Sequence, residues 1–132
     1  MAKFENLVCL IADDYSTARR LIKESLQQIG FSCLEAENGN QAIKLIQQTT
    51  LDLVIADVNM SEKNGLELLK EIRTHYNMKD LPVVLTILEP FADLISEAEK
   101  LGMNDYLIKP FDVFTLSRTL DNVIKITEGE SL

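Results

Sequence analysis

The chain has 132 residues, 46% of them hydrophobic and 26% charged, which is the size and composition of one globular domain with a single core. Its 21 acidic and 13 basic residues give a formal net charge of −8, which argues against binding to nucleic acid or to anionic membranes. The nearest candidate for a basic patch, Arg19, Arg20 and Lys23, is diluted by the neighbouring Glu24.

The cysteines and the start of the chain indicate the cellular setting. Cys9 and Cys33 lie in apolar segments without the spacing of a metal site, so we expect buried thiols in a reducing compartment. The first residues lack the apolar run of a signal peptide, and no apolar stretch reaches the roughly 18 residues of a membrane span. We therefore expect a cytoplasmic protein with a single domain over residues 1–132 and no effector domain.

Five short apolar segments predict strands. Four of them are nearly continuous runs, which suits strands covered on both faces of a sheet, although Asp52 interrupts one of these runs. The segment 31–36 is weaker and should form a more exposed strand. In chain order the predicted strands are 7–12, 31–36, 51–56, 81–86 and 105–108.

Between the strands, apolar residues recur at intervals of three and four, which predicts amphipathic helices. Gly30 and Gly102 follow the first and fourth helical patterns as natural stops. The patterns cover residues 18–29, 42–46, 66–72, 94–101 and 116–124. Strict alternation of five strands with five helices predicts an α/β fold, a doubly wound parallel sheet with helices on both faces.

Polar side chains follow the apolar runs of the predicted sheet. Asp13 and Asp14 come after the first strand, Asp57 and Thr86 end two others, and Lys109 follows the last. Because ligands bind beyond the carboxyl ends of the strands in an open parallel sheet, these side chains should converge at one edge.

Three carboxylates at one edge would repel each other unless a cation lay among them. Oxygen ligands without a cysteine or a nearby histidine favour Mg²⁺ over zinc. We predict that Asp13, Asp14 and Asp57, with the backbone carbonyl of Asn59, bind this ion.

A carboxylate beside such a metal can attack phosphorus, and Asp57 is the best nucleophile because it is the single carboxylate on a central strand. Lys109 would contact one phosphoryl oxygen and the Thr86 hydroxyl another. Taken singly, each residue has an ordinary explanation: the aspartate pair as a helix cap, Thr86 as a strand residue, Lys109 as a surface charge. Their common position at strand ends favours a site.

The ordered motifs resemble the receiver domain of bacterial response regulators, and most closely the single-domain chemotaxis type. They are Asp13-Asp14, Asp57-Val58-Asn59-Met60, Asn64-Gly65, Thr86 and Lys109-Pro110-Phe111. The resemblance implies a flavodoxin-like strand order 2-1-3-4-5 and a regulatory phosphoacceptor rather than an enzyme that turns over a separate substrate.

The resemblance also implies partners and a switch. Asp57 would receive a phosphoryl group, in the presence of Mg²⁺, from a histidine kinase or a histidine phosphotransfer protein. Thr86 and Tyr106 would form the switch that a downstream protein reads, with the chain acting as a monomer or weak dimer. Tyr106 also has the simpler interpretation of an amphipathic strand residue, and Lys109-Pro110 resembles a cis peptide of the family.

Several positions depart from the family pattern. Ser61 stands where proline is usual, so the loop after Asp57 should be less rigid, and Ile87 replaces a small residue that leaves the phosphoryl site open. The apolar residues Leu88, Pro90 and Phe91 indicate either a protein-docking surface or a buried hydrophobic staple.

Two other functions are alternatives to the phosphoacceptor. One is a docking module that no longer depends on phosphorylation, because of Ile87 and Ser61. The other is a phosphatase of the haloacid dehalogenase type, which needs a second aspartate two residues after the nucleophile, where this chain has Asn59. His75, the only histidine, is interpreted as a helix-terminal residue, so the phosphoryl group must come from another molecule.

Overall fold

The computed structural model describes residues 3–128, and the side chains of residues 3–124. Residues 1–2 and 129–132, at the ends of the predicted single domain, lie outside the described part. All five predicted strands and all five predicted helices are confirmed. They are β1 (Val8–Ala12), α1 (Ser16–Gln28), β2 (Ser32–Ala36), α2 (Gly39–Gln48), β3 (Leu53–Asp57), α3 (Gly65–Arg73), β4 (Val83–Ile87), α4 (Ala92–Lys100), β5 (Asp105–Ile108) and α5 (Val113–Glu128).

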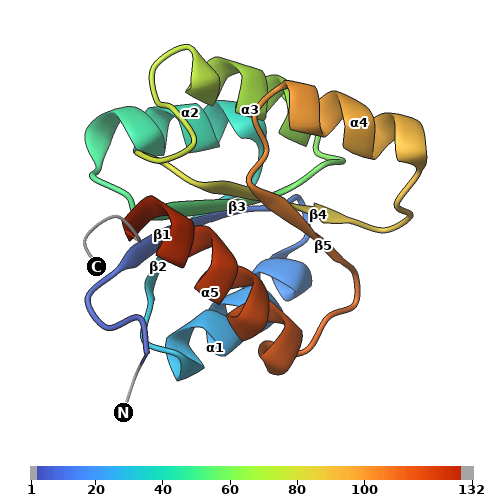
Figure 1. Cartoon of the computed structure of the whole chain (residues 1–132). Helices are drawn as coiled ribbons and strands as arrows, with labels where there is room; N and C mark the ends of the chain where they lie inside the picture. The colour runs from blue at the N-terminus through green and yellow to red at the C-terminus, as the bar shows by residue number, and fades with distance from the viewer. Residues whose placement is uncertain (1–2, 129–132) are drawn as a thin grey trace.

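The strands form one parallel sheet in the order β2-β1-β3-β4-β5, which confirms the predicted doubly wound α/β fold. Helices α2, α3 and α4 cover one face of the sheet, and α1 and α5 cover the other (Figure 1). Since β3 lies at the centre, the predicted position of Asp57 on a central strand is also confirmed.

Two apolar layers separate the sheet from its helices. Along β1, Leu10 faces the layer under α2, α3 and α4, whereas Cys9 and Ile11 face the layer over α1 and α5. This alternation, together with full burial of β3 and β4, explains the nearly continuous apolar runs of these strands. The run 105–108 is different, because β5 lies at an edge of the sheet and only Leu107 of it is buried, so the expected cover on both faces is wrong there. The edge strand β2 is more exposed, as predicted.

Local interactions set the ends of the elements. The run 51–56 becomes a strand only from Leu53, and just before it the Asp52 carboxylate accepts a hydrogen bond of 2.8 Å from the Val8 backbone N–H. Helix α3 begins with a capping box, in which Asn64 and Glu67 each accept a hydrogen bond from the other's backbone N–H. That box fixes the direction in which α3 leaves the carboxyl end of β3.

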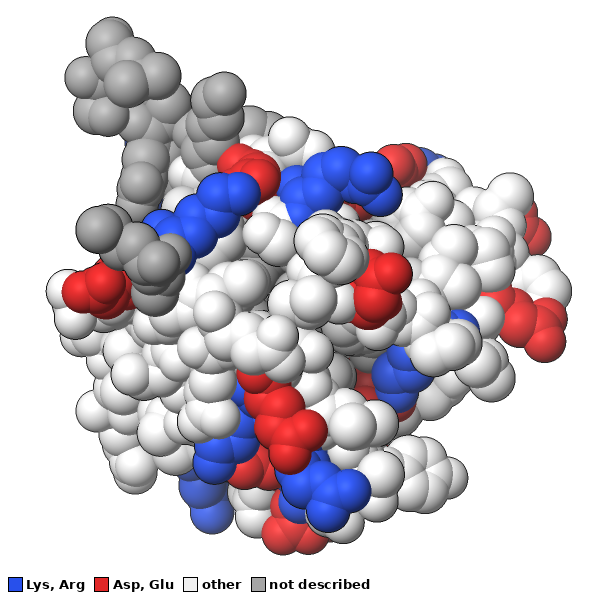
Figure 2. All heavy atoms as spheres, turned by 90° about the horizontal axis from the view of Figure 1, so that it is seen from below, with Lys and Arg blue, Asp and Glu red and all other residues white. Residues whose placement is uncertain are grey.

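The surface over α1 and α5 carries both signs of charge. Figure 2 shows lysine and arginine side chains next to acidic ones on this face, separated by uncharged surface. Arg19 and Lys23, from the nearest candidate for a basic patch, both form ion pairs with Glu35, at 3.0 and 3.5 Å. Of the helices that the structure describes, none has the length and apolar character needed to cross a membrane.

Candidate functional site

The predicted site residues lie at the carboxyl ends of the strands. Asp13 directly follows β1, Asp57 is the last residue of β3, and Lys109 directly follows β5. Thr86 is the register partner of Asp57 on β4, so both side chains lie on the same face of the sheet. Parallel pairing therefore brings together residues that are far apart in the sequence.

Lys109 joins the two buried carboxylates of the site. Its Nζ donates hydrogen bonds of 2.9 Å to Asp13 Oδ2 and 2.9 Å to Asp57 Oδ2, across 96 and 52 residues of sequence. Asp13 is fully buried and Asp57 is nearly so. Burial alone lowers the pKa of Lys109, but the hydrogen bonds to these two carboxylates outweigh it and raise that pKa. The ammonium group thus stays charged between them.

Opposing influences act on the pKa of Asp57. Burial raises the pKa of Asp57, while the hydrogen bond from Lys109 and a 3.1 Å hydrogen bond from the Asn59 N–H to Oδ1 act to lower it. Ionisation of the Asp57 carboxyl therefore depends on neighbouring hydrogen-bond donors rather than on water.

The loop after β1 holds Asp13 from the other side. The backbone N–H of Tyr15 donates to Asp13 Oδ1 at 2.9 Å, and Arg19 Nη1 donates to the Asp13 carbonyl at 2.7 Å. Both carboxylate oxygens of Asp13 therefore have donors, and its side chain is fixed in place.

The Asp14 side chain contacts Ser61 in the loop after β3. Both of its carboxylate oxygens lie 3.1 Å from the backbone nitrogen of Ser61, and the Ser61 hydroxyl lies 3.4 Å from Oδ1. This contact could not be predicted from the sequence, because the donor is a backbone N–H and residue type does not reveal its direction. The only available signal was that Ser61, unlike proline, has an N–H to donate.

Thr86 carries an unused hydrogen-bonding group. Among the buried side chains that the structure describes, Thr86 Oγ1 is the polar atom without a hydrogen-bond partner. Because an unpaired buried hydroxyl costs free energy, its persistence at the predicted site favours a ligand that would accept its hydrogen bond.

Gly65 allows α3 to begin against the site. A Cβ at this position would lie 2.5 Å from the Asp57 carbonyl oxygen and 2.7 Å from the Val58 Cα. The Gly65 N–H donates to the Val58 carbonyl at 3.0 Å. Only glycine permits this close approach, which explains the Asn-Gly pair noted in the sequence.

The donor set suits Mg²⁺ in its chemistry. Asp13, Asp14 and Asp57 supply three carboxylates against the one ammonium of Lys109, an excess of two negative charges. No described group of three or more histidine, cysteine, aspartate or glutamate side chains is gathered closely enough to hold an ion. In this arrangement Asp14 contacts Ser61, and Lys109 joins the other two carboxylates.

Comparison with known proteins decides the family. A family model described as the response regulator receiver domain matches residues 9–121. The chain belongs to this family. The receiver domain is 38% identical to chemotaxis protein CheY-3 of Vibrio cholerae, over 92% of this chain and 94% of the relative. It is 35% identical to chemotaxis protein CheY of Pseudomonas aeruginosa, over 91% and 98% of the two chains.

Solved structures agree with this assignment. The structure of the chemotaxis response regulator CheY4 of Vibrio cholerae matches the receiver domain with a TM-score of 0.82 at 30% identity. The match covers 89% of this chain and 98% of that one. The flavodoxin-like receiver fold and the likeness to chemotaxis proteins predicted from the motifs are thereby confirmed.

The structure resolves two of the departures from the family pattern. Ile87 is 1% exposed and packs in the core layer with α3 and α4, so it does not stand over the entrance to the site. Leu88 and Phe91 are 66% and 63% exposed, so the alternative of a buried hydrophobic staple is wrong. The apolar loop before α4 is a surface feature.

Tyr106 and the peptide after Lys109 also have defined positions. Tyr106 is half-buried on β5 and packs against the core layer under α4, and the Lys109-Pro110 peptide is cis. Of the two cysteines, both free, Cys9 is buried and Cys33 half-buried.

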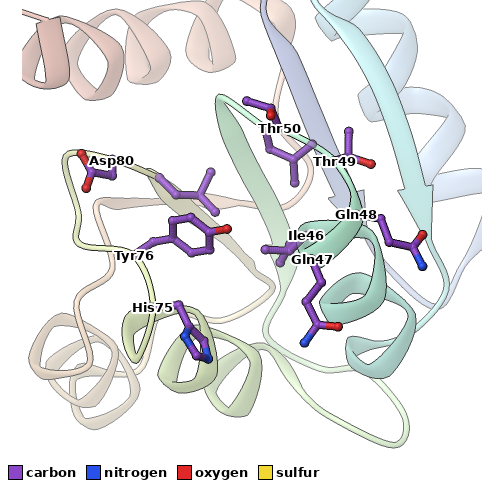
Figure 3. A pocket seen from close by; sticks show the side chains of 10 residues that line it. Ile46, Gln47, Gln48, Thr49, Thr50, His75, Tyr76 and Asp80 are labelled. Atoms are coloured by element: carbon purple, nitrogen blue, oxygen red, sulfur yellow. The ribbon is translucent and has the colours of Figure 1, made fainter.

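His75 lies away from the site, as predicted. It follows the end of α3 and, with Tyr76 and Asp80, lines a cavity next to the segments that precede β3 and β4 (Figure 3). These segments lie at the amino ends of the strands, whereas the carboxylates lie at the carboxyl ends. His75 cannot pass a phosphoryl group to Asp57 from that edge.

Proposed function

We propose that this receiver domain is a phosphorylation-dependent switch of a two-component system, with Asp57 as the phosphoacceptor. The observation that carries the proposal is the hydrogen-bonded group Asp13–Lys109–Asp57 beside the unpaired hydroxyl of Thr86. It offers a buried carboxylate as nucleophile, a charged ammonium group and a free hydrogen-bond donor at one edge of the sheet.

Each side chain has a part in the transfer. A carboxylate oxygen of Asp57 forms a bond to the phosphorus of a phosphohistidine, and the electron pair of the broken P–N bond remains on the donor's imidazole. Lys109 moves from the carboxylates to a phosphoryl oxygen, and Thr86 Oγ1 donates to another. Asp13, Asp14, Asp57 and the Asn59 carbonyl would hold Mg²⁺, which supplies neutralisation of the phosphoryl charge when it is bound.

The same movement would produce the signal. When Thr86 turns towards the phosphoryl group, the space beside β4 changes, and the half-buried ring of Tyr106 on the neighbouring strand has room to turn inward. A downstream protein would read that change on the exposed surface that includes Leu88 and Phe91. The switch would act in the cytoplasm, and its phosphodonor would be a histidine kinase or a histidine phosphotransfer protein.

The test is phosphoryl uptake by the purified chain. We expect incubation with acetyl phosphate and Mg²⁺ to add one phosphoryl group to the intact mass, and neither EDTA-treated protein nor Asp57→Asn to gain it. Asp80→Asn is the matched control, because Asp80 is exposed and lies before β4, at the opposite edge of the sheet. It should take up phosphate like the wild type.

Two results would contradict the proposal. A phosphoryl group that persists in Asp57→Asn would place the acceptor elsewhere. If the wild type neither gains a phosphoryl group nor binds beryllofluoride, the phosphorylation-independent docking module would be the better function.

A further inference from the structure

The loop between β3 and α3 contains a contact that competes with the proposed metal site. The Ser61 N–H lies 3.1 Å from each carboxylate oxygen of Asp14, and the Ser61 hydroxyl adds a longer contact of 3.4 Å. This Ser61–Asp14 contact joins the loop after β1 to the loop after β3, across 47 residues of sequence. It holds the one proposed carboxylate ligand that Lys109 does not reach.

The loop holds Ser61 in place independently of Asp14. Asn40 Nδ2 donates to Glu62 Oε1 at 3.2 Å, and Lys63 Nζ pairs with Glu71 at 2.8 Å. The Lys63 N–H also donates to the Ser61 carbonyl at 2.8 Å. Because these bonds fix the loop from the side of α2 and α3, the Ser61 N–H keeps its direction, and release of Asp14 requires its own side chain to rotate.

Both carboxylate oxygens of Asp14 face the Ser61 N–H, and an oxygen that shares its lone pairs between this N–H and a cation binds each of them less strongly. Among the described residues, the Asp14 side chain contacts Ser61, whereas Asp13 and Asp57 share Lys109, and no three carboxylates are gathered closely enough to hold an ion. The free energy of the Ser61–Asp14 contact must therefore be given up when Asp14 approaches a metal ion.

We propose that Ser61 is a positioning residue whose backbone N–H holds Asp14 in the metal-free chain and so weakens Mg²⁺ binding. This inference rests on the proposed function, since it requires the site to take Mg²⁺. The determinant is the presence of any residue other than proline at position 61, because proline has no N–H to donate. The serine hydroxyl contributes less, since its distance to Asp14 is longer.

The test compares two substitutions at this position. Ser61→Pro removes the N–H and Ser61→Ala removes only the hydroxyl. We expect calorimetric titration to show Mg²⁺ binding about three- to tenfold tighter in Ser61→Pro, which corresponds to the loss of one competing hydrogen bond. Ser61→Ala should bind within about twofold of the wild type.

A double-mutant cycle separates this effect from stiffening of the loop by proline. In an Asp14→Ala background, the contact is already absent, so Ser61→Pro should leave Mg²⁺ affinity unchanged. An equal gain in both backgrounds would assign the effect to loop rigidity and overturn the proposal.

Wild-type protein provides a second readout that does not depend on the proline variant folding. The Ser61 amide proton should shift upfield in NMR spectra as Mg²⁺ saturates the chain, because it loses its carboxylate acceptor. An unchanged Ser61 resonance at saturating Mg²⁺ would overturn the proposal while leaving the proposed function intact. If no variant binds Mg²⁺ at all, both are overturned.

Discussion

Asp57 depends on a single ammonium group for much of its charge stabilisation. Burial raises its pKa, and the hydrogen bond from Lys109 is the largest influence in the opposite direction. That ammonium is shared with Asp13, at the same distance of 2.9 Å. The folded chain therefore keeps two buried carboxylates near one cation, and the excess of negative charge opposes stability unless a further cation binds.

The raised pKa of Asp57 has a definite effect on stability. Since the folded chain binds this proton more tightly than the unfolded chain, the contribution of Asp57 is fully present below the ordinary value of 3.8 and is lost as pH rises through the folded pKa. At neutral pH the buried charge opposes folding.

We therefore predict that Asp57→Asn stabilises the protein at pH 7. The expected gain in Tm is roughly 3–5 °C, the change produced by about 1 kcal/mol in a domain of this size. The gain should shrink as pH falls towards 3.8, where the wild-type carboxyl is also neutral. Scanning calorimetry across this pH range measures it, with Asp80→Asn as the exposed control. A gain independent of pH would show that charge is not the cause.

At the scale of the elements, Arg73 fastens the end of α3 to two other segments. Its guanidinium donates to the carbonyls of Leu81 and Gly102 at 2.8 and 2.9 Å, and to Asn104 Oδ1 at 2.8 Å. Burial lowers the pKa of Arg73 to about 10, so it remains charged at neutral pH. The end of α3, the approach to β4 and the approach to β5 are thus held by one planar group.

Arg73→Lys should destabilise the fold by about 1–3 kcal/mol, because a lysine cannot reproduce the fork of donors and leaves carbonyls unpaired. Urea unfolding should show a lower midpoint with an unchanged slope. Arg20→Lys, at an exposed position of α1, is the matched control and should change the midpoint little. Phosphoryl uptake should survive in Arg73→Lys at low temperature, since the contact lies at the amino ends of the strands. Equal midpoints for the two variants would refute the structural role.

For the whole molecule, the apolar runs and helical periods were sufficient to predict a doubly wound parallel α/β fold, whereas the strand order was predicted from the family resemblance. The alternation of apolar runs with helical periods shows where each strand ends. Parallel pairing of the strands then brings Asp13, Asp57 and Lys109 to the carboxyl ends of the sheet. Sequence could not reveal contacts made by backbone donors, such as Ser61 to Asp14. Nor could it show that Ile87 faces the core, since the direction of a side chain at a strand end depends on the local alternation. The role of Arg73 at the end of α3 could not be predicted either, because most of its hydrogen-bond acceptors are backbone carbonyls.

The site exists only in the folded chain, since its three joined residues come from β1, β3 and β5 or the residues directly after them. Ligands bound there must therefore stabilise the whole domain by mass action, by about 2.7 kcal/mol at a concentration one hundred times Kd. We expect Mg²⁺ with beryllofluoride to raise the wild-type Tm in thermal unfolding followed by circular dichroism, and EDTA to reverse the rise. Asp57→Asn should gain nothing from beryllofluoride, because it lacks the carboxylate to which that phosphoryl analogue binds. An equal rise in Asp57→Asn would place the binding outside this site, since every other surface of the two proteins is the same.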